Sequence, residues 1–412
     1  MVLRKKEDTD NMQISELKHY KLRMQIIRYL YKKSPQPASY LSKKTHVSLP
    51  TVRAVLDELI TEKIICITGI GPSKGGRRPI LYSLLSEAYY IMAVEVGHHR
   101  AKASLFNCHN KEVTEIHEYT TNIDDPHFLE HTKAVFDQLL VQSGLKRSQI
   151  VALGVSMPGL IDSVNGINKT IKDPKAQAVK ARLSKHFNIP IYIENDARMQ
   201  ALGESVFGKA QKTKNTLVLN WHWGLGLGMI LDGQIYQGAN GSAGEFSHLR
   251  IIPQGKLCTC GKQGCLQTIA STQTLLDMAK AEIAKKTPSQ LTSSYASKPE
   301  ELDVTAITNY AKRGDELSIS LLHQLSSNLA WGLSILIELY NPELIVLNGP
   351  VTQAGKYILI PIQQALNQYC LDNIIEDIRI EISELGEHSG LKGVAVMVFQ
   401  KLFRDKSTDS HY

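Results

Sequence analysis

The N-terminal region alternates apolar and polar residues with the period of α-helices. Between Tyr20 and Lys32 the apolar residues fall on one side of a helix, and the prolines within 34–37 end it. We expect a short second helix over about 38–45, and a third that Ser48 is placed to cap. The apolar residues of the third helix repeat at i, i+3, i+4 and i+7: Val52, Val55, Leu56 and Leu59. Helix, short helix, tight turn and helix are typical of a helix-turn-helix.

The pattern then changes to that of two strands around a glycine-rich loop. Ile64–Gly69 and Ile80–Leu84 read as strands, and the loop at 71–79 reads GPSKGGRRP. Glycines let a backbone approach a DNA groove closely, and arginines reach phosphates or the narrow minor groove. This loop is typical of a wing. The sequence therefore predicts a winged helix-turn-helix over residues 1–88, with the first dozen residues forming a mobile arm.

The helix-turn-helix geometry assigns roles to individual side chains. The start of the third helix would enter the major groove, so Thr51 and Arg53 would face base edges. Lys43 and Lys44 would meet phosphates. The candidate DNA-binding residues are Lys43, Lys44, Ser48, Thr51, Arg53, Lys74, Arg77 and Arg78.

From residue 89 onwards, strand patterns alternate with helical ones. Strands are expected at 89–96, 101–106, about 112–119, 150–156, 189–193, 216–221, 225–231 and 344–347. Helices are expected at about 126–143, at 198–207, in long stretches after Ser271 and from about Gly390, with a Ser/Lys-rich insertion near 286–300. A hairpin at Asp232-Gly233 requires an antiparallel pair, so the sheets should be mixed. This is the pattern of α/β layers.

The charge of the chain is concentrated in its N-terminal fifth. The 412 residues carry 47 Lys+Arg against 40 Asp+Glu, a net charge of +7. Residues 1–88 hold 16 Lys+Arg against 8 Asp+Glu, so the other 324 residues hold 31 against 32. A basic module on a near-neutral body favours a polyanionic partner, nucleic acid before membrane, although a solvated basic face would give the same charge.

Three of the six cysteines lie within eight residues, Cys258, Cys260 and Cys265, and His248 stands ten positions before the first. Three thiolates and an imidazole are a ligand set that zinc prefers, and glycines at 261 and 264 let the loop turn back on the ion. A disulfide is the alternative. The chain has no signal-peptide start and no apolar run that spans a membrane, so we expect a cytoplasmic protein, in which such cysteines more often bind metal. Cys66, Cys108 and Cys370 are expected to be small buried hydrophobic residues.

Further chemistry is indicated at three places in the body. In Glu194-Asn-Asp-Ala197, at a strand end where a helix begins, Asp196 could accept a hydroxyl proton and Asn195 could orient the hydroxyl; either residue could equally cap the helix. Glu245, three residues before His248, would be held rigidly by a metal loop. The glycines of 224–228 suit close backbone approach but more often mark a bulge.

These motifs together resemble the ROK family, which groups bacterial sugar-responsive repressors with sugar kinases. The resemblance rests on GGRRP at 75–79, LGVSMPG at 153–159, ENDA at 194–197, GSAGEFSH at 241–248 and CTCGKQGCL at 258–266. The chain is similar to N-acetylglucosamine-type and xylose-type repressors of this family. The family implies an α/β fold of two actin-like (ribonuclease-H-like) lobes, as in sugar kinases, with a sugar cleft between them and a zinc loop. By this resemblance the zinc ligands are His248, Cys258, Cys260 and Cys265, and the sugar site contains Gly159, Asn195, Asp196, Glu245, His248 and, by position, Gln267.

Two departures from the family pattern affect the predicted activity. Family kinases begin the body with an Asp-x-Gly-Gly-Thr-Lys turn that holds ATP phosphates, whereas Glu95-Val-Gly-His-His-Arg100 stands here. We therefore expect no enzyme activity, although Asp196, the family's catalytic base, is retained. The second departure is Gln267, where the family usually places a sugar-binding Glu. A neutral amide forfeits the charge-assisted hydrogen bond that a carboxylate would make.

The predicted protein is a sequence-specific transcriptional regulator, a repressor of sugar uptake or catabolism genes. The expected domains are 1–88, a first lobe at 89–208 joined by the C-terminal helix 390–405, and a second lobe at 209–389 with the zinc loop and an oligomerisation surface. The expected partners are operator DNA, a sugar or sugar-phosphate effector, Zn²⁺ and further copies of the chain as a homodimer or homotetramer, with no membrane insertion. Two alternatives are an ATP-dependent hexose or N-acetylhexosamine kinase with a fused DNA-binding domain, and a repressor controlled by a protein partner.

Overall fold

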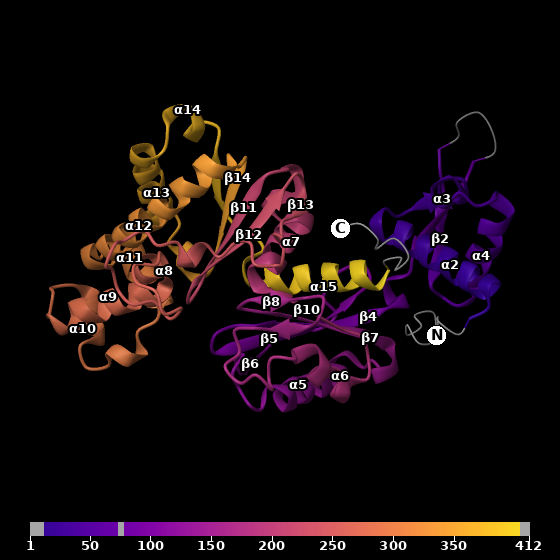
Figure 1. Cartoon of the computed structure of the whole chain (residues 1–412), viewed down its shortest axis with the longest axis horizontal. Helices are drawn as coiled ribbons and strands as arrows, with labels where there is room; N and C mark the ends of the chain where they lie inside the picture. The colour runs from indigo at the N-terminus through magenta and orange to yellow at the C-terminus, as the bar shows by residue number, and fades with distance from the viewer. Residues whose placement is uncertain (1–11, 73–77, 404–412) are drawn as a thin grey trace. The chain divides into compact units, whose positions relative to one another are not determined.

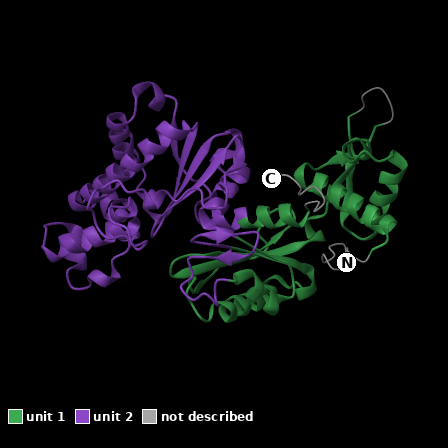
Figure 2. Cartoon of the chain, in the orientation of Figure 1, with its two compact units in different colours: residues 1–155, 178–193, 394–412 green, residues 156–177, 194–393 purple. Residues whose placement is uncertain are grey.

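The structure is a computed structural model that describes residues 12–72 and 78–403. The chain forms two compact units (Figure 2). Unit 1 contains Met1–Val155, Ala178–Ile193 and Val394–Tyr412, and unit 2 contains Ser156–Gln177 and Glu194–Gly393. In the described residues no helix is long and apolar enough to cross a membrane.

In its described residues, the N-terminal part of unit 1 has three helices and a three-stranded sheet (Figure 1). The helices are α2 (Ile14–Lys32), α3 (Ala38–Thr45) and α4 (Leu49–Thr61), and the strands are β1 (Gln36–Pro37), β2 (Ile65–Ile70) and β3 (Ile80–Leu84), in the order β1-β3-β2. The second and third helices and the two strands predicted on either side of the loop at 71–79 are confirmed within one or two residues. The first helix begins six residues earlier than predicted, because Glu16 accepts the backbone N–H of Gln13 and so starts the helix there. Strand β1 was not predicted.

One arginine holds the first helix against the third. Arg23 of α2 donates to Glu58 at 3.0 Å and to Glu62 at 2.6 Å, and both carboxylates belong to the α4 end. A second side chain of α2 reaches other parts of unit 1. Tyr31 donates to Asn110 Oδ1 at 3.0 Å, and its ring centroid lies 5.4 Å from that of Phe403. The N-terminal helices are therefore anchored by specific contacts as well as by their apolar face.

The first body sheet has five strands in the order β10-β7-β4-β5-β6. The strands are β4 (Tyr90–Val96), β5 (Arg100–Asn107), β6 (His117–Thr120), β7 (Ile150–Met157) and β10 (Ile191–Asn195). Helices α5 (Phe128–Ser143) and α6 (Val179–Phe187) lie together on one face (Figure 1), where Phe136 and Phe187 pack edge to face at 5.4 Å. Strand β6 is shorter than predicted because Glu112 forms only an isolated bridge, to Phe106. Helix α6 was not predicted.

The second body sheet has the order β13-β12-β11-β14-β15. Its strands are β11 (Thr216–Trp221), β12 (Leu225–Leu231), β13 (Gln234–Ile235), β14 (Leu344–Asn348) and β15 (Arg379–Ile382). Strand β11 pairs antiparallel with β12 and parallel with β14, so the predicted mixed sheet is confirmed. If the five strands of each body sheet are numbered by their order in the sequence, both sheets have the spatial order 3-2-1-4-5, read from β6 in the first sheet and from β13 in the second. A short ribbon of β8 (Ile161–Asp162) and β9 (Ile167–Asn168) stands apart.

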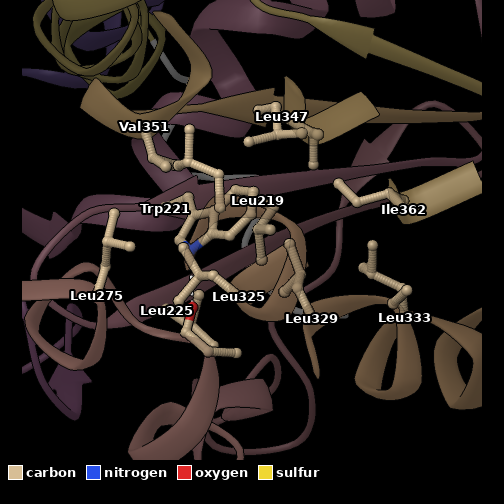
Figure 3. Close-up of a cluster of buried hydrophobic side chains, with 14 of the residues drawn as sticks. Leu219, Trp221, Leu225, Leu275, Leu325, Leu329, Leu333, Leu347, Val351 and Ile362 are labelled. Atoms are coloured by element: carbon tan, nitrogen blue, oxygen red, sulfur yellow. Dashed lines mark hydrogen bonds between the residues drawn. The ribbon is translucent and has the colours of Figure 1, made fainter. Parts of the chain in front are cut away.

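The core of unit 2 lies between the second sheet and a group of helices (Figure 3). The helices of unit 2 after β13 are α8 (Gln267–Ala270), α9 (Thr272–Ala284), α10 (Gln290–Tyr295), α11 (Val304–Lys312), α12 (Glu316–Tyr340), α13 (Lys356–Tyr369) and α14 (Asp372–Ile375). Trp221 is fully buried among leucines of β11, α9 and α12, and its indole N–H donates to the carbonyl of Ala270 at 2.7 Å. Burying an indole together with its hydrogen bond fixes the sheet against the helices.

Helix α7 (Asp196–Phe207) and the first five residues of α15 (Ser389–Leu402), which belong to unit 2, approach each other closely. A Cβ atom on Gly393 would lie 1.7 Å from the carbonyl oxygen of Met199, and one on Gly203 would lie 2.2 Å from that of Ser389. Only glycine fits at such distances, because the helix backbones themselves touch. Asn348 fixes the start of α15 by donating to Ser389 Oγ at 2.7 Å.

Candidate functional site

The candidate DNA-binding side chains are exposed around the start of α4. Ser48 caps this helix as predicted, because its hydroxyl accepts the backbone N–H of Thr51 at 3.4 Å and pairs with the Thr51 hydroxyl at 2.7 Å. His46 ends α3 in the left-handed conformation with φ 56°, which makes the tight turn. Of the predicted set, Lys43, Lys44, Ser48, Thr51, Arg53 and Arg78 are exposed, and Lys74 and Arg77 lie outside the described residues.

The four predicted metal ligands come together in unit 2. The donor atoms of His248, Cys258, Cys260 and Cys265 all lie within 4.8 Å of one another. His248 Nδ1 is 3.7 Å from Cys258 Sγ, and Cys260 Sγ is 3.7 Å from Cys265 Sγ. Two sulfurs bound to one tetrahedral zinc at ~2.3 Å would lie about 3.8 Å apart. The spacing therefore fits a shared ion, and all six cysteines are free thiols, so the alternative of a disulfide is not seen.

The backbone of the cysteine loop explains this convergence. The N–H of Cys258 donates to the carbonyl of Lys262 at 2.8 Å, which closes a tight turn. Gly261 and Gly264 have φ values of 83° and 78°, a region that disfavours other residues. At Gly264 a Cβ would also lie 1.7 Å from the carbonyl oxygen of Ile252. The two glycines therefore allow the turn that the sequence predicted for them.

The thiols of the loop differ in acidity. Burial opposes ionisation of Cys258, but hydrogen bonds from the backbone and side chain of Cys260 and from His248 outweigh it and lower the pKa of Cys258 to about 6. Burial, together with the neighbouring thiols, raises the pKa of Cys265 to about 12. The Cys258 thiolate therefore forms readily, whereas Cys265 would need a bound cation to lose its proton, as expected of a metal site.

Asn195 and Asp196 lie at the junction of β10 and α7. The Asn195 side chain caps α7 by accepting the backbone N–H of Arg198 at 3.2 Å, and its amide donates to the carbonyl of Gly159 at 3.2 Å. Gly159 has φ 107°, and a Cβ there would lie 2.6 Å from Thr170 Oγ1. Asn195 therefore joins two backbone segments of the candidate sugar site, in agreement with its alternative role as a helix cap.

The Asp196 carboxyl group has an unusual protonation equilibrium. Burial, together with the nearby Glu245, raises the pKa of Asp196 to about 6, although backbone hydrogen bonds and Arg198 oppose the shift. Burial also raises the pKa of Glu245, and Arg198 opposes that shift too. A carboxylate with a pKa near neutrality is suited to exchange a proton with a bound hydroxyl.

Sequence reasoning missed the buried ion pair between Glu194 and Arg198. Glu194 Oε1 accepts from Arg198 Nε at 2.9 Å and Nη2 at 2.5 Å, and the two residues are 1% and 3% exposed. The third arm of the guanidinium, Nη1, donates to the carbonyl of Gly241 at 2.6 Å. Arg198 therefore ties the start of α7 to the loop that carries Glu245 and His248. The spacing of four residues was the available signal in the sequence.

The structure also places the remaining predicted sugar residues. Glu245 Oε2 lies 4.0 Å from His248 Nε2, on the side of the imidazole opposite the nitrogen that faces Cys258. The Gln267 side chain donates to Cys258 Sγ at 2.9 Å. The candidate sugar residues, from Gly159 to Gln267, all belong to unit 2.

Two glycine-containing turns differ in what their glycines do. A Cβ on Gly228 would lie 2.4 Å from the carbonyl oxygen of Ala197, so this glycine lets β12 pack on α7 and supports the structural interpretation of 224–228. In the turn between β4 and β5, the Gly97 N–H donates to the Arg100 carbonyl at 2.8 Å. The exposed rings of His98 and His99 meet edge to face at 4.5 Å in this turn.

Residues 91–401 match the ROK family. The "Xylose repressor" of Caldicellulosiruptor bescii is 28% identical over 369 residues, 88% of this chain and 91% of that protein. The "Glucokinase" of Halalkalibacterium halodurans is 30% identical over 325 residues, 77% of this chain and 97% of that protein. A solved ROK family transcriptional regulator, described as a homolog of E. coli MLC protein, superposes with a TM-score of 0.76 at 26% identity and covers 93% of this chain and 97% of its own.

Proposed function

The chain belongs to the ROK family, and we propose that it is a DNA-binding transcriptional repressor of sugar uptake or catabolism genes, controlled by a sugar or amino sugar. The observation that carries the proposal is the N-terminal module joined to the ROK body. The xylose repressor matches 88% of the chain, whereas the glucokinase matches 77% with nearly its full length. That difference is expected if repressors share the N-terminal module and the kinase lacks it.

The N-terminal module supplies the DNA-binding part of the proposal as a winged helix-turn-helix. The tight turn at His46 and the capped start of α4 present exposed Thr51 and Arg53 on the helix that would read base edges. Lys43 and Lys44 at the end of α3 would bind phosphates, with Arg78 of the wing. We further propose a homodimer or homotetramer on a roughly palindromic operator, since paired modules read paired half-sites.

The effector part of the proposal rests on the polar groups around Asp196. We assign the sugar-binding site to five residues, because carboxylates and an imidazole can each form hydrogen bonds with hydroxyl groups. They are Gly159, Asn195, Asp196, Glu245 and His248. Arg198 connects the start of α7 to the loop that carries Glu245 and His248, because it donates hydrogen bonds to Glu194 and to the Gly241 carbonyl. A ligand that prefers one arrangement of these segments would shift the protein between its DNA-binding states.

We assign zinc to His248, Cys258, Cys260 and Cys265. The donor set and the 3.7 Å spacings fit tetrahedral coordination. When bound, the ion would hold the four ligand residues together and so fix His248 beside Glu245.

We predict that Cys260→Ser loses zinc and weakens the response to effector more than operator binding. Metal content and DNA affinity, measured with and without effector, check this. If Cys260→Ser weakened the effector response and operator binding equally, the metal would support the whole fold.

A kinase is the second candidate function, favoured by Asp196. Its pKa of about 6 suits a general base that accepts the proton of an attacking hydroxyl. The proposal of a repressor without kinase activity rests on the Gly97-His98-His99 turn, where two imidazoles occupy the place of small phosphate-binding residues. Sustained ADP release that is lost in Asp196→Asn, at high protein concentration over hexoses and N-acetylhexosamines, would establish the kinase.

The experiment that tests the proposed repressor has two steps. Binding sites are first selected from fragmented genomic DNA by the purified protein, and affinity for the selected site is measured by fluorescence anisotropy. Xylose, glucose, N-acetylglucosamine and their phosphates are then titrated into the complex. We expect sequence-specific binding that one of these sugars changes at least tenfold. Binding that no sugar affects would favour the alternative of a protein partner, which pull-down from cell extract addresses. Absence of sequence preference would refute the repressor.

A further inference from the structure

The side chain of Gln267 is turned towards the cysteine loop. Gln267 opens helix α8, directly after Cys265 and Leu266. Its amide nitrogen donates to Cys258 Sγ at 2.9 Å and to Thr259 Oγ1 at 3.0 Å. A primary amide carries two N–H hydrogens, so both are used within the loop. Neither hydrogen remains for a sugar hydroxyl in this conformation.

The chemistry of the cluster favours a neutral donor at this place. Three thiolates and Zn²⁺ sum to a charge of −1, with the imidazole neutral. Each thiolate sulfur is then an acceptor that gains from an N–H donor, because the bond is charge-assisted. A carboxylate at the same position has no hydrogen to donate, and would place a second negative charge against Cys258. The loop therefore distinguishes Gln from Glu although the two side chains have the same shape.

We propose that Gln267 is a zinc-positioning residue whose amide nitrogen holds the Cys258 thiolate in place, so that both N–H donors of the amide serve the cysteine loop and not the sugar. The proposal rests on the zinc assignment made above. It explains a departure from the family pattern in terms of contacts within this chain. Partners of metal ligands orient those ligands, and their loss weakens metal binding by about 10- to 100-fold in characterised sites.

Three variants separate hydrogen bonding from charge. Gln267→Met keeps the length of the side chain and removes the donor, and Gln267→Glu removes the donor and adds a negative charge. Gln263→Glu is the matched control, because it adds the same charge within the same loop on an exposed residue. An exposed charge is screened by solvent and salt, so its effect should be small.

The measurement is made on the full-length protein. Zinc content of the wild type is determined first, and zinc affinity of each protein follows from competition with a chromophoric chelator. We expect Gln267→Glu to weaken zinc binding about tenfold or more, Gln267→Met to weaken it less, and Gln263→Glu to change it by less than about threefold. With Co²⁺ in place of zinc, the sulfur-to-metal charge-transfer band should shift in both Gln267 variants, since the donor to one sulfur is gone.

Each other outcome overturns a defined part of the proposal. Wild-type zinc binding with unchanged affinity and unchanged cobalt spectra in both Gln267 variants refutes the positioning role alone. Equal weakening by Gln267→Glu and Gln263→Glu, with no change in Gln267→Met, reduces the effect to charge and also refutes it. A folded wild-type protein that binds neither zinc nor cobalt refutes the metal assignment itself, and the role of Gln267 with it.

Discussion

The buried carboxyl group of Asp196 lowers the stability of the folded protein when it is ionised. Burial raises its pKa to about 6 from the value near 3.9 of an unfolded chain. The folded state therefore binds this proton more tightly, and the resulting stabilisation is complete below about pH 4 and is lost as the pH rises through 6. Two pKa units correspond to about 3 kcal/mol, and the partial exposure of the residue makes this an upper limit.

We predict that Asp196→Asn raises the free energy of unfolding by about 1 to 3 kcal/mol at pH 7.5 and changes it little at pH 4. The amide cannot ionise, so the penalty at neutral pH is removed. Urea unfolding at the two pH values measures both terms, with Asp137→Asn on the exposed face of α5 as the control. A stability gain that is the same at both pH values would show that ionisation is not its cause.

Arg198 is predicted to contribute to both stability and the sugar site. Arg198→Met would leave the Glu194 carboxylate buried without its cation, and losing one partner of such a pair costs about 3 to 5 kcal/mol. Adding Glu194→Gln should recover part of this loss, because the unpaired charge is then removed. Urea unfolding of the two single variants and the double variant gives the coupling energy. Additive single effects would mean that the ion pair contributes nothing of its own.

For individual residues, the sequence predicts the site at 194–197 but not the contacts that its side chains make. Glu194-Asn195-Asp196 was recognised as a site at the end of a strand, and the capping role of Asn195 was foreseen as an alternative. The Gly241 carbonyl that Arg198 binds lies 43 positions away in the chain. No local pattern specifies such a distant partner, because it depends on how α7 and the loop pack together.

The cysteine loop contains two glycines, Gly261 and Gly264, that have similar backbone conformations but different surroundings. Gly261 and Gly264 both have positive φ, so alanine at either position costs about 1 kcal/mol in backbone strain. Only at Gly264 would the new Cβ also overlap a neighbour, the Ile252 carbonyl oxygen at 1.7 Å. We predict that Gly264→Ala lowers the melting temperature and zinc retention clearly more than Gly261→Ala does. Calorimetry and metal analysis check this, and similar losses in the two variants would argue against close packing at Gly264.

Elements with a strong apolar period were predicted well, and short polar ones were not. Helix α4 matched because four apolar residues at helical spacing follow a capping serine. Helix α10 lies in the segment expected to be an insertion, because its Ser/Thr-rich sequence has weak helix propensity. Ser289 caps its start, because the Ser289 hydroxyl accepts the N–H of Thr292, and distant Asp315 accepts the N–H of Gln290. Strand β15 has only four residues, none of them buried.

The two body sheets share a strand order that the sequence does not reveal. Both body sheets have the same strand order, yet no internal repeat is visible in the residues. A strand order constrains which segments are apolar and how they connect, and many unrelated sequences meet that constraint. The aromatic contacts of Tyr31 with Phe399 and Phe403 join residues more than 360 positions apart, and they likewise could not be read from local patterns.

The charge partition of the whole chain leads to the last prediction, on DNA binding. A phosphate contact carries no sequence information, so Lys43→Ala should weaken binding to operator and unrelated DNA equally and reduce the slope of log affinity against log salt by about 1. Arg53 faces base edges in the proposed complex. Arg53→Ala should therefore cost about 1 to 3 kcal/mol on the operator and relax its specificity.

Fluorescence anisotropy over a salt series with both DNA types separates these effects, and Lys185→Ala on α6 controls for loss of one positive charge outside the N-terminal module. If Arg53→Ala weakened binding to both DNAs equally, Arg53 would be a phosphate contact and the base-reading surface would lie elsewhere on α4. If Lys185→Ala changed the salt slope as much as Lys43→Ala, the body would share the binding of DNA with the module. The charge surplus of residues 1–88 would then be only part of the electrostatic surface that attracts DNA.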